Sequence, residues 1–206
     1  MNDTSAEEQH YRRAESAFCR GGGVSNAIRS VDYHYLPGLE DRFEAKRREY
    51  DARFGEDGHS IIYGFHGTAS PFSIEGILRD GFKLSFLGKS TGNAGYYGAG
   101  IYFSEGMWRA QQFVEGHGQL MLCKILLGKP CVVSQAVGRG LELGCTSHVS
   151  DASGSEVVIF DESCVLPVYV IHTTPSPGCG ILGSPLKGLH YPHIHGPLSR
   201  MGKRKL

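Results

Sequence analysis

The chain has 206 residues, and its 21 lysine and arginine residues balance its 21 aspartate and glutamate residues. This balance excludes a strong overall charge of the kind that attracts nucleic acid or anionic membranes. No segment approaches the ~20 consecutive apolar residues of a membrane-spanning helix, and the polar N-terminus does not resemble a signal peptide. We therefore expect an intracellular protein, cytoplasmic or nuclear, with no membrane partner.

The cysteines and histidines give no pattern typical of a structural metal site. None of the six cysteines forms a C-x-x-C pair, and without a signal peptide we expect all six to be reduced thiols. Cys145 and His148 have the spacing of two zinc ligands, but a second pair of ligands is missing. The sequence therefore predicts no metal in the main domain.

The chain divides into an arm, a domain and a tail. Residues 1–27, which contain three consecutive glycines at 21–23 that could act as a hinge, are predicted to be a flexible N-terminal arm. Residues 28–174 carry all the strong periodic patterns and are predicted to form one domain. Residues 175–206 are rich in glycine, proline and histidine, which favours a poorly packed C-terminal tail.

Inside the domain, strand patterns outnumber helix patterns. Ser70 and Pro71 form a helix start, and Gly81 suits its C-terminal cap. Residues 82–100 form a loop long enough to be functional. Pro167 predicts an edge position or a bulge for the last strand. Because strands and helices do not alternate regularly, the fold class is α+β. The predicted strands are 30–35, 60–65, 101–103, 119–127, 131–134, 156–160 and 165–171, and the predicted helices are 39–53, 70–81 and 106–114.

Three polar side chains stand at the ends of short apolar runs. His66 follows a buried strand and is followed by Gly67, whose small size lets a flat ligand approach the main chain, and by the hydroxyl of Thr68. Tyr102 follows a glycine-rich turn and offers a ring that could stack on an aromatic ligand. Glu156 begins an apolar strand. Each residue alone is also compatible with a structural role, and only their combination indicates a site.

In this order, His66, Tyr102 and Glu156 resemble the histidine–tyrosine–glutamate triad of the poly(ADP-ribose) polymerase catalytic domain, a diphtheria-toxin-like ADP-ribosyltransferase. The resemblance covers roughly residues 28–174, and it includes the charged segment 39–47 and the segments 76–82, 126–130 and 165–171. It implies an ADP-ribosyltransferase fold, in which split mixed or antiparallel sheets and a few helices surround an NAD cleft.

The resemblance also implies the residues that hold NAD. The backbone of Gly67 would bind the nicotinamide carboxamide, and His66 and Thr68 would contact the adenine-side ribose. Tyr102 would form one wall of the nicotinamide slot, and Phe113 would stand where the family commonly has a second tyrosine.

Two further positions complete the expected site. Lys83 matches a basic residue near the adenosine, and residues 82–97 correspond to the loop that lines the cleft. Ala110 stands where the family commonly places a serine that bonds the carboxamide. Loss of one neutral hydrogen bond would weaken NAD binding by about 0.5–1.5 kcal/mol.

By this resemblance the protein is an NAD ADP-ribosyltransferase, a glycosyltransferase of the pentosyltransferase class, that releases nicotinamide and uses no metal. Glu156 would be the catalytic residue, because a carboxylate can stabilise the positive charge that develops on the ribose. Mono-ADP-ribosylation is favoured, since residues 135–155 offer little basic surface for a second ADP-ribose, although Glu156 keeps polymer synthesis open. The acceptor is expected to be a protein, and no nucleic-acid-binding module is attached.

Two alternatives remain open. The first is a weakly active module that binds NAD or ADP-ribose and works through protein interaction, which Ala110 favours. The second is a metal-binding interaction protein that uses the tail residues His190, His193 and His195.

Overall fold

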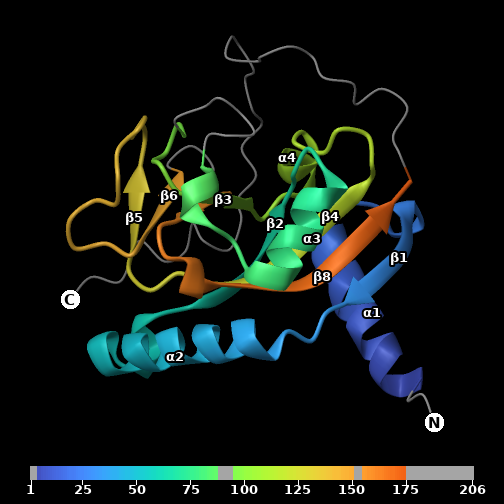
Figure 1. Cartoon of the computed structure of the whole chain (residues 1–206), viewed down its shortest axis with the longest axis horizontal. Coiled ribbons are helices and arrows are strands. Elements are labelled where there is room, and N and C mark those ends of the chain that lie inside the picture. The colour runs from blue at the N-terminus through green and yellow to red at the C-terminus, as the bar shows by residue number, and fades with distance from the viewer. Residues whose placement is uncertain (1–3, 88–94, 151–154, 175–206) are drawn as a thin grey trace.

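The computed structural model describes residues 4–87, 95–150 and 155–174, which contain four α-helices and eight strands (Figure 1). Among the described helices, none combines the length and apolar character that a bilayer span requires. In chain order the elements are α1 (Thr4–Arg20), β1 (Ile28–Tyr33), α2 (Pro37–Phe54), β2 (Ile61–His66), α3 (Pro71–Asp80), β3 (Ile101–Ser104), α4 (Met107–Gln111), β4 (Gln119–Leu126), β5 (Pro130–Val133), β6 (Ser147–Ser150), β7 (Glu156–Ile159) and β8 (Val165–Thr173).

All eight strands join one sheet in the order β1-β8-β4-β2-β3-β7-β6-β5. Every neighbouring pair is antiparallel except β5 and β6, which are parallel. At the centre, β2 and β3 share a single residue pair, Phe65 with Ser104, whereas β2 and β4 are paired along six residues. The sheet is therefore divided into two halves at this seam, which confirms the α+β class with split, mixed sheets.

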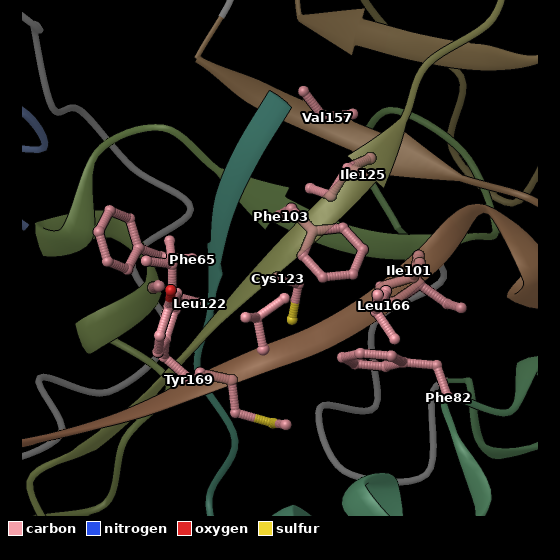
Figure 2. Packing of buried hydrophobic residues seen from close by; sticks show 14 of the residues in the cluster. Phe65, Phe82, Ile101, Phe103, Leu122, Cys123, Ile125, Val157, Leu166 and Tyr169 are labelled. Carbon is pink, nitrogen blue, oxygen red and sulfur yellow. The ribbon is translucent and has the colours of Figure 1, made fainter. Parts of the chain in front are cut away.

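The core lies on both faces of β4 and β8, whose side chains are almost all buried. In Figure 1, α3 lies in front of these strands and α1 passes behind them. Residues from all four helices and from six of the strands meet in one apolar cluster, and Figure 2 shows part of it. Burial on both faces explains why β4 and β8 are nearly continuous apolar runs rather than alternating ones.

Local signals in the sequence place several elements correctly. The Ser70 hydroxyl accepts a hydrogen bond from the Phe72 amide, and Gly81 ends α3 with a positive φ of 80°. Pro167 lies in an interior strand, where the register shifts between Leu122 and Cys123 of β4. The predicted bulge is therefore confirmed, and the predicted edge position is wrong.

The prediction of a flexible N-terminal arm is wrong for the described residues from Thr4 onward. They form α1, which buries Ala14, Ala17 and Phe18 at helical spacing against the sheet. The expected glycine hinge is also a packing site: a Cβ on Gly21 would come within 2.8 Å of both the Phe65 ring and the Glu105 carbonyl oxygen. Close approach, rather than mobility, explains why glycine stands here.

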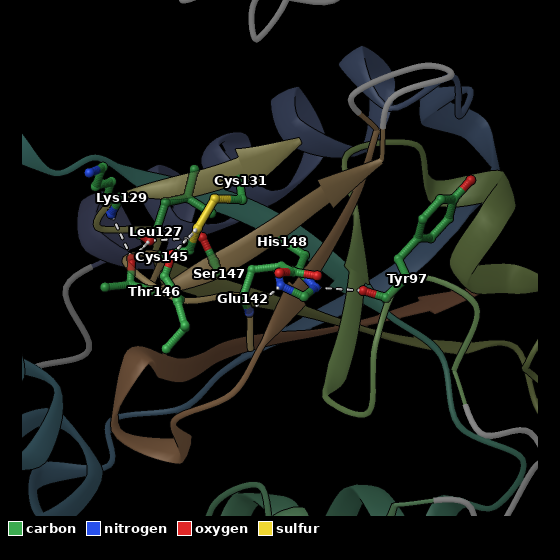
Figure 3. The surroundings of a disulfide bond; sticks show 10 residues. Tyr97, Leu127, Lys129, Cys131, Glu142, Cys145, Thr146, Ser147 and His148 are labelled. Atoms are coloured by element: carbon green, nitrogen blue, oxygen red, sulfur yellow. Dashed lines mark hydrogen bonds between the residues drawn. A yellow bond between two sulfur atoms is a disulfide. The ribbon is translucent and has the colours of Figure 1, made fainter. Parts of the chain in front are cut away.

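Two features of the region between β5 and β7 differ from the predictions. No strand was predicted at β6, because three of its four residues are polar; all four are nevertheless buried. In addition, Cys131 and Cys145 form a disulfide with a Cα–Cα distance of 5.8 Å, so the prediction that all cysteines are reduced is wrong for this pair (Figure 3). The residues before β6 return alongside β5, which brings the two cysteines together.

Hydrogen bonds hold this return in place. The Thr146 hydroxyl accepts from the Lys129 amide and donates to the Leu127 carbonyl, and the Ser147 hydroxyl donates to the same carbonyl at 2.9 Å (Figure 3). The predicted tail at 175–206, with its histidines, lies outside the described residues.

Candidate active site

Three adjacent strands at the seam bring the predicted triad together. His66 ends β2, Tyr102 lies in β3, and Glu156 begins β7. Glu156 pairs directly with Ser104, two residues from Tyr102 on the same strand, so the Tyr102 and Glu156 side chains share one face of the sheet. Segments that are separated by 36 and 54 residues in the sequence therefore converge at one end of the seam.

The His66 ring is fixed between main-chain and aromatic partners. Its Nδ1 lies 2.9 Å from the Tyr102 carbonyl oxygen, which can only accept, so Nδ1 carries the proton and Nε2 is left as an acceptor. The ring packs edge-on against Phe82 at 4.9 Å between centroids. Burial lowers the pKa of His66, which keeps the imidazole neutral near pH 7.

The Tyr102 hydroxyl holds the glycine-rich turn before β3. It accepts a hydrogen bond from the Tyr97 amide at 2.8 Å and donates one to the Gly98 carbonyl at 2.9 Å. Burial, together with the nearby Glu156 carboxylate, raises the pKa of Tyr102 to about 12. The phenol is therefore neutral, and its hydroxyl group has a structural role. The face of its ring remains available for contact with a ligand.

The Glu156 carboxylate is paired with a residue that the sequence did not indicate. Arg109 on α4 places its Nε 3.0 Å from Glu156 Oε1, and both side chains are largely covered, with exposed fractions of 27% and 15%. The same guanidinium bonds the Gln112 amide oxygen and lies 6.0 Å from the centre of the Phe113 ring. Arg109 stands four residues before Phe113 in the predicted helix 106–114, and residues i and i+4 share a helix face. This spacing was the one signal in the sequence that could have pointed to Arg109.

Gly67 lies directly against α4. A Cβ on Gly67 would stand 1.9 Å from the carbonyl oxygen of Ala110, so only glycine fits at this position. Within the described residues, Gly67 has no backbone hydrogen-bond partner. Next to it, the Thr68 carbonyl accepts a bond from His117 Nε2 at 2.8 Å, which fixes the main chain beyond the strand.

The remaining predicted residues lie at the edges of this site. Phe113 follows α4 and is 41% exposed, as a wall of an open slot would be. Lys83 stands at the start of the 82–97 loop, where its Nζ is 3.5 Å from Glu162. The other oxygen of Glu162 accepts a bond from the Leu84 amide at 2.6 Å. The Lys83 charge is therefore already opposed by a carboxylate, and residues 88–94 of its loop lie outside the description.

Behind the site, His148 joins two loops. It is fully buried, its Nδ1 donates to the Tyr97 carbonyl at 2.7 Å, and its Nε2 accepts from the Glu142 amide at 3.0 Å (Figure 3). The spacing of Cys145 and His148 thus reflects a disulfide and a hydrogen-bonded histidine. In the described part of the chain, no three metal-ligating side chains gather in one place.

Comparison with known proteins agrees with this geometry. No curated protein sequence is similar enough to count as a match. The family model for the poly(ADP-ribose) polymerase catalytic domain matches residues 22–167. This range contains α4, the strands β1 to β7, the first three residues of β8, and the three triad residues. The chain therefore belongs to the poly(ADP-ribose) polymerase catalytic-domain family, and the activity that this membership implies is NAD-dependent ADP-ribosyl transfer.

Proposed function

We propose that the protein transfers a single ADP-ribose unit from NAD to a protein acceptor, with Glu156 as the catalytic residue. The observation that carries this proposal is the Glu156 carboxylate, which is held at 3.0 Å by Arg109 on the same face as Tyr102. A largely covered carboxylate on the same sheet face as Tyr102 is suited to stabilise positive charge on a bound sugar.

Each predicted binding residue has a role that its surroundings support. The main-chain groups of Gly67, which have no backbone partner among the described residues, would hold the nicotinamide carboxamide, and the Nε2 of His66 would accept a hydrogen bond from a ribose hydroxyl. Thr68 would contact the same ribose. The rings of Tyr102 and Phe113 would enclose the nicotinamide, since offset stacking needs only their faces.

Lys83 would assist on the adenosine side. Its pairing with Glu162 at 3.5 Å weakens this role, because the carboxylate already offsets its charge. We therefore assign Lys83 a smaller share of NAD affinity than His66 or Gly67.

The chemistry follows from the charge that develops on the ribose. The bond between the ribose C1′ and the nicotinamide nitrogen breaks, its electron pair leaves with the neutral nicotinamide, and C1′ gains oxocarbenium character. Glu156 would bind the 2′-hydroxyl and stabilise that charge. The acceptor then attacks C1′ and loses its proton to the carboxylate or to water. Arg109, whose Nε lies 3.0 Å from Glu156 Oε1, orients the carboxylate before NAD binds.

The surface next to the turn before β3 supports a protein acceptor and a single transfer. The loop after β5 is bonded to the turn before β3 through Ala136 with Tyr96 and through Arg139 with Ala99. Its side chains include exposed Val137, Leu141 and Leu143, and Val132 of β5 is exposed beside them. Arg139 is the only cation of residues 134–146. An apolar flank favours a peptide, whereas a growing polymer would bring two phosphate groups that need cations.

The test is to incubate the purified chain with NAD, measure nicotinamide release, and size the product on the protein by mass spectrometry. We expect additions of one ADP-ribose unit per modified side chain. Ladders of successive units would overturn the single-transfer proposal, and nicotinamide release with no modified protein would overturn the protein acceptor.

A weakly active NAD-binding module is the second candidate, and Ala110 is the observation that favours it. This side chain is 4% exposed and lies against Gly67, where the family's serine would offer a hydroxyl. NAD binding with a rate of nicotinamide release no higher than that of the Glu156→Gln variant would support this candidate instead.

A further inference from the structure

A cavity of about 60 Å³ lies away from the active site, between α1, the end of β1 and the sheet. It shares no lining residue with the triad or with the other predicted NAD-binding residues. Its floor is a row of directly opposed residues on neighbouring strands, Tyr63, Lys124 and Leu166. Its walls come from α1 and from the link between β1 and α2. It is therefore a separate feature that family membership does not explain.

The lining carries more positive than negative charge. Arg13 and Lys124 both line the cavity, and Glu40 is the only carboxylate that does so. Neither cation takes part in an ion pair among the described residues. The phenol groups of Tyr169 and Tyr63 raise the pKa of Arg13 and hold its guanidinium at the cavity. Two cations without carboxylate partners favour an anion as ligand.

Histidine adds a hydrogen-bonding group that lacks a partner. His34 lines the cavity, and its Nε2 is buried with no hydrogen-bond partner among the described residues. Burial lowers the pKa of His34, so the neutral ring can carry its proton on Nε2 and act as a donor. A buried polar atom without a partner is costly and uncommon in folded proteins. An acceptor that reached this atom from the cavity would remove that cost.

The cavity wall is also rigid. His10 on α1 stacks on the Tyr33 ring with 3.6 Å between centroids, and its Nδ1 is 3.0 Å from the Tyr169 hydroxyl. Tyr33 and Tyr169 are in turn directly opposed on β1 and β8. A wall that is fixed before binding loses little freedom when the ligand arrives.

We propose that this cavity binds a phosphoryl group, either free phosphate or the phosphate of a small ester. The planar guanidinium of Arg13 can donate hydrogen bonds to two oxygens of a tetrahedral anion. Lys124 supplies a compact positive charge, and His34 offers a neutral donor. The cavity volume is sufficient for one phosphoryl group, and the rest of an ester would have to lie outside the cavity. Tyr33 and Tyr35 are exposed around it, so the organic part of an ester would lie against their rings.

The experiment is isothermal titration of the whole chain with inorganic phosphate at fixed ionic strength. Lys124→Gln should weaken binding at least about tenfold, since it removes one charged hydrogen bond. Lys124 has no ion-pair partner among the described residues, so this variant should keep its fold even if Arg13→Gln, which loses two tyrosine contacts, does not. Lys124→Arg should restore binding.

Arg12→Gln is the matched control, because Arg12 is the exposed neighbour of Arg13 on α1 and lies outside the cavity. It should bind phosphate as the unchanged chain does. Phenyl phosphate binding more tightly than phosphate would identify an ester as the source, and equal affinity would identify the free anion. No phosphate binding, or equal binding by Lys124→Gln and the unchanged chain, would overturn the proposal, as would acetate binding as tightly as phosphate.

Discussion

A methyl group on Gly67 is the smallest change that tests how closely α4 packs against the end of β2, where we propose that nicotinamide binds. Its Cβ would stand 1.9 Å from the Ala110 carbonyl oxygen, where ordinary contact begins at 3.4 Å, so the backbones must separate by 3.4 − 1.9 = 1.5 Å. The obstructing atoms belong to the main chain and cannot rotate away. Overpacking of this kind costs about 1–3 kcal/mol.

Two measurable losses follow from Gly67→Ala. For a domain of this size, 1 kcal/mol corresponds to ~2–4 °C in the melting temperature, so we expect Tm to fall by roughly 2–12 °C. A displacement of this size at the predicted carboxamide site should also lower kcat/KM for NAD by about 100-fold. Differential scanning fluorimetry and nicotinamide release measure the two effects separately.

Gly76→Ala is the matched control. Gly76 lies within α3, and a Cβ there meets nothing within 4 Å, so alanine should raise stability by about 0.5–1 kcal/mol and leave NAD kinetics unchanged. A Gly67→Ala variant with unchanged Tm and kcat/KM would refute the reasoning, because it would mean that the contact between Gly67 and α4 does not exist in solution.

Three further changes test other parts of the account. Tyr102→Phe should cost about 1–3 kcal/mol, measured as a lower Tm, because the main-chain groups at 97–98 lose their hydroxyl partner; an unchanged Tm would count against the assigned bonds. Ala110→Ser should lower the KM for NAD by up to about tenfold, and a higher KM would contradict the assigned slot. Reducing the Cys131–Cys145 disulfide opens a loop with a sequence separation of 14, so Tm should fall by an amount equivalent to about 3 kcal/mol, and equal Tm values with and without reductant would mean that the bond does not form.

The sequence predicted the elements whose signals are local. The helix start at Ser70 and Pro71 and the apolar runs of β4 and β8 act through neighbouring residues, so they could be recognised directly. The triad could be placed on strand ends for the same reason. Their convergence came from the family resemblance, because single strand ends do not reveal which strands are neighbours in a sheet.

The features that were missed depend on packing between distant segments. Helix α1 buries a narrow stripe ending in Phe18 on an otherwise charged surface, and its partner Phe65 is far away in the sequence. Strand β6 buries polar side chains, which a hydrophobic pattern cannot detect. Arg109 became a candidate only when Glu156 was found beside it.

The most direct test of the central claim is the Glu156→Gln variant, which keeps the size of the side chain and removes its charge. We expect NAD affinity within a few fold of the unchanged chain and a loss of transfer of at least about 100-fold. Glu105→Gln is the control, because it makes the same substitution at a carboxyl whose main-chain amide donates to the Ser155 carbonyl, next to Glu156, and which is not among the predicted site residues. Transfer by Glu156→Gln at the rate of the unchanged chain would contradict the claim that Glu156 carries the chemistry.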